Sequence, residues 1–283
     1  MKRVLKFICN EFVFGGHITA LAALCLVLTA SMVLRVELDW SFPVIVYLGV
    51  YLAYFFNRYK EHKQDSFSNI KRFEHFKGYF FIMPAWFVFV FFLFIFFVLF
   101  YAPPPEAVII LTLFFLGILY SLFLKKLTRK ILSFKSFFVS LMWSSVVIFL
   151  VFYHSLSLDA SAWLFFSFVL LRMFVHSSFF DVKDLESDER ENMLTLPIKL
   201  SKKNFFYLLN IISFISLTPI ISGVYLGLLP GFSLFLVITF FISIYYLYSY
   251  DKHREDLGLF SQIAISGEKI VWPLLVLMGK LVF

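Results

Sequence analysis

The sequence predicts an all-α membrane protein: a bundle of nine transmembrane helices with acidic helical loops on its cytoplasmic side. Hydrophobic residues make up 61% of the 283 residues and charged residues only 15%, and the mean hydropathy is +0.89. A soluble domain is typically about half apolar, so this composition indicates a chain that resides in a bilayer. The apolar runs are continuous and lack the alternation of a membrane β-barrel. We expect a single domain over residues 1–283.

Each helix is predicted by an apolar run near the length of roughly 20 residues that crosses the hydrocarbon core. In chain order the expected spans are 12–34, 40–56, 78–101, 107–124, 133–153, 160–180, 204–229, 231–250 and 266–283. The first is too long for a signal peptide and lacks a small-residue cleavage site, so we expect it to remain as an anchor. The second is short. Glu268 and Lys269 open the ninth, and without that span the bundle has eight helices.

The basic residues set the expected orientation. With a cytoplasmic N-terminus, every lysine and arginine except Arg35, Arg172 and Lys280 falls in or beside an inside segment. This distribution follows the positive-inside rule. The net charge of +7 is therefore a topology signal, and it implies no nucleic-acid partner. We expect a multi-pass protein of the cell membrane whose N-terminus and active-site loops are cytoplasmic.

One acidic cluster follows the sixth expected span. In "FFDVKDLESDER", Asp181, Asp184 and Asp188 are three and four residues apart, so on a helix they lie within about 60° of arc. Three carboxylates on one face repel one another unless a cation joins them. Hard oxygen ligands suit Mg²⁺, which commonly completes its coordination with substrate phosphates.

A second acidic stripe follows the second expected span, whose orientation matches that of the sixth. In "NRYKEHKQD", Asn57, Glu61 and Asp65 are spaced four apart and again share one helix face. Two such helices facing each other would hold one or two Mg²⁺ ions and bind a diphosphate. Further positive charge for the phosphates would come from Lys71, Arg72, Lys125, Lys126 and Lys130. The alternative is a solvated acid–base surface that serves solubility and topology.

These residues resemble the signature of the UbiA superfamily of intramembrane prenyltransferases, which has nine transmembrane helices and aspartate-rich motifs after helices two and six. The second motif, D-x-x-D-x-x-x-D, is matched by "DVKDLESD" at Asp181, Asp184 and Asp188. "LTLPIKLS" resembles the TLP element of the family at residues 195–197, and "LYSLFLKK" resembles a tyrosine–serine element that begins at Tyr120. The resemblance covers essentially the whole chain.

The first motif departs from the family pattern N-D-x-x-D-x-x-x-D. Asn57 and Asp65 keep their places, but Arg58 stands where the first acid belongs and Glu61 stands in for the second. One carboxylate is lost and one cation is gained. Arg58 either contacts a phosphate directly or marks a subgroup with a different donor or weaker metal binding. An inactive member of the family is a further alternative.

The resemblance implies a Mg²⁺-dependent enzyme that transfers an isoprenoid chain from a prenyl diphosphate to an aromatic or other lipid-precursor acceptor. By the same resemblance, Tyr120 becomes a pocket residue and the two motifs become metal sites. The implied metal ligands are Asn57, Glu61, Asp65, Asp181, Asp184 and Asp188, the implied diphosphate contacts are Arg58, Lys71, Arg72, Lys125, Lys126 and Lys130, and the implied catalytic residues are Asp181, Asp184 and Tyr120.

Three alternatives to a prenyltransferase remain open on the sequence. A membrane terpene cyclase and a phosphoribosyl transferase acting on a lipid phosphate belong to the same superfamily. A transporter belongs to another class, and the near absence of charged residues inside the expected spans disfavours it.

Two polar residues inside the expected spans are also candidates for a role. Arg172 lies in the sixth span, where a buried cation is costly and is by default a functional hypothesis. Its helical phase is opposite to that of Asp181, which favours a structural partner. His17 follows two glycines in "FGGHITA", which permit close packing, and it lines a pocket or makes a helix contact.

Overall fold

A computed structural model describes residues 2–250, 252–253 and 257–283 of the chain. Every regular element within these ranges is a helix, which confirms the all-α prediction. Among the described residues, seven helical segments are long and apolar enough to cross a membrane, so this is a multi-pass membrane protein: His17–Leu34, Met83–Tyr101, Pro104–Leu122, Phe134–Tyr153, Ala160–Phe180, Lys202–Tyr225 and Gly231–Ser249. Residues 251 and 254–256, in the expected loop after the eighth span, lie outside the described residues.

The expected spans at 40–56 and 266–283 are the two that do not appear among these seven. Each is part of a longer helix, α3 (Ser41–Ser68) or α14 (Leu257–Val282). Polar and charged residues interrupt the apolar run in both, at Asn57 and Arg58 in α3 and at Glu268 and Lys269 in α14. The count of nine transmembrane helices therefore stays a prediction.

The chain divides into two compact units, which are described separately. Unit 1 comprises Met1–Leu24 and Asp39–Leu124. It contains the start of α2 together with α1 (Lys2–Phe14), α3 (Ser41–Ser68), α4 (Ile70–Lys77), α5 (Met83–Tyr101) and α6 (Pro104–Leu122). The long helix α3 packs against α4, α5 and α6, and α1 packs against α4. The helix α3 is thus the scaffold of this unit.

The first expected span, 12–34, begins differently from the prediction. The helix α1 ends at Phe14, and α2 (His17–Leu34) starts a separate helix after Gly15 and Gly16. Gly16 has a φ of 109°, a conformation that a residue with a side chain adopts only with strain. The apolar run continues through this joint, so hydropathy alone gave no sign of it.

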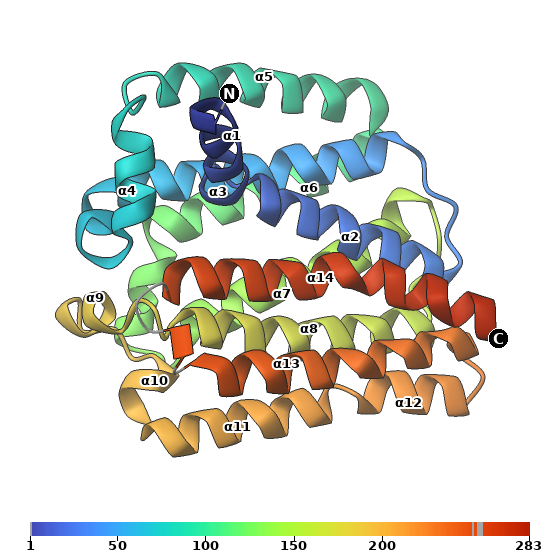
Figure 1. Ribbon diagram of the computed structural model, residues 1–283. Coiled ribbons are helices and arrows are strands. Elements are labelled where there is room, and N and C mark those ends of the chain that lie inside the picture. Colours follow the sequence, from blue (N-terminus) through green and yellow to red (C-terminus); the bar gives the residue numbers. More distant parts are fainter. Residues whose placement is uncertain (1, 251, 254–256) are drawn as a thin grey trace. The chain divides into compact units, whose positions relative to one another are not determined.

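Unit 2 comprises Cys25–Leu38 and Lys125–Phe283. Its first helices are the end of α2, the 3₁₀ helix η1 (Leu124–Arg129), α7 (Phe134–Tyr153), α8 (Ala160–Phe180), α9 (Leu185–Arg190) and α10 (Leu196–Lys199). Its last are α11 (Lys202–Ile215), α12 (Thr218–Tyr225), the 3₁₀ helix η2 (Gly231–Val237), α13 (Ile238–Ser249) and α14 (Leu257–Val282). The helix α8 contacts α7, α11, α12 and α14, and Figure 1 shows α14 running alongside it.

A buried ion pair links four helices of unit 2. Arg172 of α8 is fully buried and forms an ion pair with Glu268 of α14. Its guanidinium also donates to Ser213 of α11 at 2.5 Å and to the carbonyl of Thr239 in α13 at 3.0 Å. His176, one turn along α8, places Nε2 3.0 Å from the other oxygen of Glu268. Arg172 thus has the structural partner that its helical phase favours.

The same unit holds the end of α8 in an apolar cluster. Val175, Phe179 and Val182 pack with Leu196 of α10 and Phe205 of α11, all of them buried. Burying large apolar side chains contributes about 1.5–3 kcal/mol each. This cluster therefore fixes the chain on either side of Asp181, where the second acidic motif begins.

The Arg172 ion pair generates a test of the fold. Arg172→Met would leave the Glu268 carboxylate buried without its main cation, which typically costs about 3–5 kcal/mol. We expect a clearly lower unfolding temperature for this variant in detergent or nanodiscs. The double variant Arg172→Met/Glu268→Gln should recover part of the loss. The exposed Lys203→Met is the matched control, and an unchanged unfolding temperature for Arg172→Met would contradict the structural role of the pair.

Candidate active site

The second acidic motif lies where α8 ends. After Phe180 the chain makes a turn through Asp181 and Asp184 and enters the short helix α9, which contains Asp188. The backbone N–H of Asp184 donates to the carbonyl of Asp181 at 3.2 Å, and that of Asp188 donates to the carbonyl of Asp184 at 2.8 Å. The acidic motif was expected to lie on one continuous helix, but the structure forms a turn followed by a short helix. The backbone hydrogen bonds still link the three aspartates at helical intervals of three and four residues.

Two of these aspartates converge on one lysine. Lys135, in the first turn of α7, places Nζ 3.2 Å from Oδ1 of Asp181 and 2.5 Å from Oδ2 of Asp188. Ser136 donates to the other oxygen of Asp181 at 2.6 Å. All three charged side chains are buried. From the sequence Lys135 was expected only as one of the basic residues in or beside an inside segment, and nothing in its local pattern signals this contact.

Asp184 has a different environment. It accepts hydrogen bonds from Lys183 at 2.7 and 2.9 Å, and its side chain is 28% exposed. Burial alone would raise the pKa of Asp184, but the charges of Lys183, Lys135 and Lys125 outweigh this effect and lower its pKa to about 2. Asp184 is therefore fully ionised at neutral pH.

The two carboxyls beside Lys135 behave in the opposite way. Burial raises the pKa of Asp188 to about 6, although Lys135 opposes the shift. Burial also raises the pKa of Asp181, against the charge of Lys135 and the hydrogen bond from Ser136. The charge of Lys135 therefore offsets only part of the rise in pKa that burial causes in Asp181 and Asp188.

A basic loop is held close to this motif. The backbone N–H of Leu194 donates to the carbonyl of Thr128 at 2.8 Å, and the N–H of Ser133 donates to the carbonyl of Leu194 at 2.7 Å. These bonds join the η1 loop to the segment that follows α9. Of the predicted phosphate contacts in this loop, Lys125 is half-buried and Lys126 and Lys130 are exposed.

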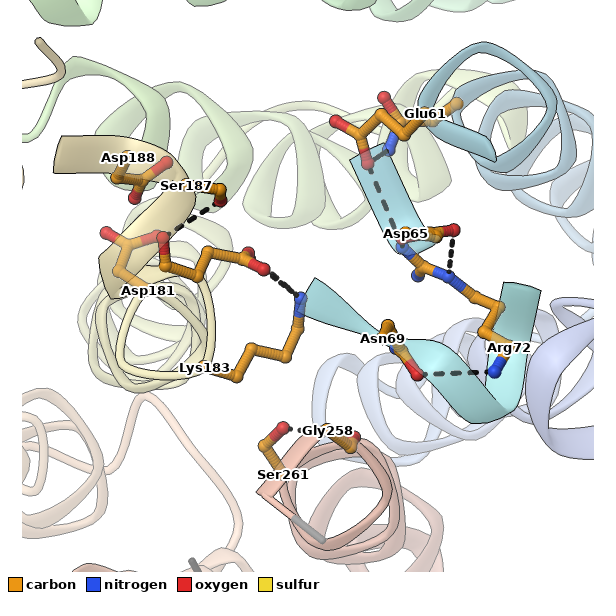
Figure 2. A network of polar contacts seen from close by, with 12 residues as sticks. Glu61, Asp65, Asn69, Arg72, Asp181, Lys183, Ser187, Asp188, Gly258 and Ser261 are labelled. Carbon is orange, nitrogen blue, oxygen red and sulfur yellow. Dashed lines mark hydrogen bonds and ion pairs between the residues drawn. The ribbon is translucent and has the colours of Figure 1, made fainter. Parts of the chain in front are cut away.

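The first acidic motif lies in unit 1, on the final turns of α3. Asn57 donates to Glu61 at 2.9 Å, as their shared helix face predicts. Figure 2 shows Arg72, from α4, reaching the carboxylate of Asp65. The Nε atom of Arg72 donates to Oδ2 of Asp65 at 2.7 Å while Nη2 bonds Oδ1, and Nη2 lies 4.0 Å from Glu61. Each motif thus forms an ion pair with a basic side chain from a neighbouring helix: Arg72 for the first motif and Lys135 for the second.

The remaining predicted site residues of unit 1 differ in exposure. Lys71 is exposed on α4, and Tyr120 is half-buried near the end of α6. Arg58 is almost fully buried. Burial, and then the charge of Arg72, lower the pKa of Arg58 to about 10, which leaves its guanidinium charged at neutral pH.

The acidic residues do not form a ready-made metal site. Among the described residues, no group of three or more histidine, cysteine, aspartate or glutamate side chains is arranged to hold an ion. The donor chemistry nevertheless suits a hard cation, because Asp181 and Asp188 already converge on the ammonium of Lys135. A divalent ion at this point would compete with Lys135.

Comparison with known proteins gives a consistent picture of the fold. A sequence profile described as the UbiA prenyltransferase family matches residues 17–265. A structure of a digeranylgeranylglyceryl phosphate synthase in membranes is 16% identical, with a TM-score of 0.59, over 100% of this chain and 98% of that one. The apo structure of a UbiA homolog from Aeropyrum pernix K1 is 12% identical, with a TM-score of 0.67, over 93% of this chain and 97% of that one. A search of curated proteins finds no match.

The lysine between the two aspartates yields a second prediction. Lys135→Met would leave two buried carboxylates without their cation, and we expect a loss of about 3–5 kcal/mol of stability. Because the freed oxygens suit a hard divalent ion, millimolar Mg²⁺ should raise the unfolding temperature of this variant more than that of the wild type. Thermal unfolding with and without Mg²⁺ measures both effects. Lys199→Met, on an exposed site, is the control, and equal Mg²⁺ responses would contradict the prediction.

Proposed function

The chain belongs to the UbiA prenyltransferase family, and from this premise we propose that it transfers an isoprenoid chain from a prenyl diphosphate to an aromatic or other lipid-precursor acceptor. The observation that carries the proposal is the second acidic motif. Asp181, Asp184 and Asp188 gather at the end of the membrane-spanning helix α8, beside a basic loop. Carboxylates next to lysines suit the recognition of a metal-bound diphosphate.

We assign a Mg²⁺ requirement to the two motifs. The ligands would be Asp181, Asp184 and Asp188 in unit 2, and Asn57, Glu61 and Asp65 in unit 1. When bound, the ion neutralises the charge that develops on the departing diphosphate. The convergence of Asp181 and Asp188 on one cation supports this assignment.

The chain's own cations would bind and orient the phosphates. Lys125, Lys126 and Lys130 belong to a loop that two backbone hydrogen bonds fix to residue 194, so the backbone that carries them is already ordered before an anion binds. Lys71 and Arg72 have the same role on α4. Fixed charges placed where negative charge develops stabilise the transition state.

The apolar helices would protect the carbocation that forms when the diphosphate leaves. Water captures such a cation, so a water-poor cavity is required. The chain carries 42 phenylalanines, and aromatic faces stabilise nearby cations. Tyr120 is the aromatic residue that we assign to this role, on α6.

The reaction products separate this function from its alternatives. A terpene cyclase would release diphosphate without an acceptor, whereas a phosphoribosyl transferase would require phosphoribosyl pyrophosphate. A transporter would move a solute across liposomes without chemical turnover. Diphosphate release combined with extraction of the lipid product distinguishes all four.

The acidic motif gives the direct test of the activity. Asp181→Asn and Asp184→Asn should each lower Mg²⁺-dependent diphosphate release from prenyl diphosphates by on the order of 100-fold or more, because each removes charge at the leaving group. The assay uses purified protein in nanodiscs, with a series of prenyl chain lengths and a panel of acceptors. Glu186→Gln is the matched control, since this acid lies in the same segment but is exposed. Wild-type protein that releases no diphosphate from any donor would refute the proposal.

The proposed orientation can be tested with a native cysteine. We propose that the N-terminus and the acidic loops are cytoplasmic, as the basic residues predict. Cys9 on α1 is exposed, whereas Cys25 is buried. A membrane-impermeant maleimide should therefore label Cys9 in inside-out vesicles and leave it unlabelled in right-side-out vesicles. Cys9→Ser should abolish the signal, and labelling only from the outer side would reverse the topology.

A further inference from the structure

The joint between α1 and α2 has an unusual neighbour. Gly16 has a φ of 109°, and a Cβ atom at this position would lie 2.8 Å from Nη1 of Arg58. The next heavy atom from another side chain, Cδ2 of Tyr51, would be 3.7 Å away. The guanidinium of Arg58 therefore occupies the space that glycine leaves open at the start of α2.

Arg58 lacks the anion that its buried position calls for. Its side chain is buried, and Nη1 has no hydrogen-bond partner among the described residues. A buried guanidinium normally pairs with a carboxylate or another anion, because leaving its charge uncompensated is costly. This arginine stands where the family's first motif has an acid.

The start of α2, beside Arg58, also favours a bound anion. The helix α2 begins at His17 and is 18 residues long. The first N–H groups of a helix have no carbonyl of the helix to bond, and the helix dipole adds partial positive charge there. Nη1 of Arg58 thus lies beside the start of α2, and positive charge at a helix N-terminus attracts an anion.

The nearby acidic side chains of Asp65 and Glu11 are bound to residues other than Arg58. Asp65 is bound by the fork of Arg72. A Cβ atom added at Gly15 would clash with Oε1 of Glu11, and Oε2 of Glu11 accepts hydrogen bonds from His75 at 2.7 Å and from Tyr79. Neither carboxylate forms an ion pair with Arg58 in the described part of the chain.

Aromatic side chains pack against the first residue of α2. The ring of His17 stacks on Tyr51 with centroids 4.6 Å apart, and its Nδ1 lies 2.7 Å from the hydroxyl of Tyr47. These contacts hold the first residue of α2 in place.

We propose that the backbone of Gly16 and His17, together with Arg58, forms a subsite that binds a phosphate group of the diphosphate donor directly, without a metal ion between them. This inference rests on the proposed function for the identity of the donor. It also explains why Arg58 stands where the first motif of the family has an acid. The arginine would bind the phosphate directly, whereas the acid would bind the phosphate through Mg²⁺. Arginine suits this role because its planar fork matches two phosphate oxygens.

The test measures binding of inorganic pyrophosphate in the presence of EDTA. Protein in nanodiscs of neutral lipid is titrated by calorimetry, and its unfolding temperature is recorded in parallel. We expect wild-type protein to bind, Arg58→Gln to bind at least about tenfold more weakly, and Lys63→Gln, an exposed site on the same helix, to match the wild type. Binding that requires Mg²⁺, or that is unchanged in Arg58→Gln, would overturn the subsite.

Two further measurements distinguish loss of the subsite from a folding defect, and the diphosphate donor from a lipid phosphate. Gly16→Ala keeps Arg58 but fills the space before it, so it should also weaken binding; pyrophosphate affinity equal to the wild type in that variant would overturn the role of the helix start. Stabilisation by nanodiscs containing phosphatidic acid, without any response to pyrophosphate, would overturn the assignment to the donor. Pyrophosphate binding in EDTA that persists while no prenyl donor is consumed would support the subsite and refute the proposed activity alone.

Discussion

The ammonium of Lys135, held between the carboxylates of Asp181 and Asp188, is the contact on which the candidate site depends. Without a cation, two buried acids at the end of α8 would repel each other and the turn into α9 would open. A buried ion pair adds little net stability compared with apolar packing, but losing one partner is costly. The pair therefore selects one geometry, in which the start of α7, the end of α8 and the start of α9 lie together.

The same principle recurs away from this site. In unit 2, Arg172 of α8 pairs with Glu268 of α14 inside the helix bundle. In unit 1, Arg72 of α4 holds Asp65 of α3. In each case the cation and the acid come from different helices, so the pair specifies which helices pack together. In an apolar environment, where nearly every side chain is compatible with every other, such pairs supply specificity that hydrophobic packing lacks.

The sequence predicted the features that depend on local patterns. The runs behind α5, α7 and α8 were located to within a few residues because continuous apolar segments of this length rarely form anything but membrane-spanning helices. The shared face of Asn57 and Glu61 followed from helical periodicity, and the structure joins them by a hydrogen bond. The break at Gly16 was missed because both sides of it are apolar. The partners Lys135 and Glu268 were missed because a tertiary contact between two helices leaves no trace in the spacing of either one.

The distribution of charge makes the two motifs chemically unequal. In the second motif three acids remain, and Asp184 is ionised and partly exposed to an incoming ion. In the first motif, Arg58 has replaced an acid, and Asp65 is bound by both ends of the Arg72 fork. Affinity for a divalent ion rises with the number of carboxylates that are able to reach it. We therefore expect metal binding to be concentrated in the second motif, and we expect the first motif to engage a phosphate directly through Arg58.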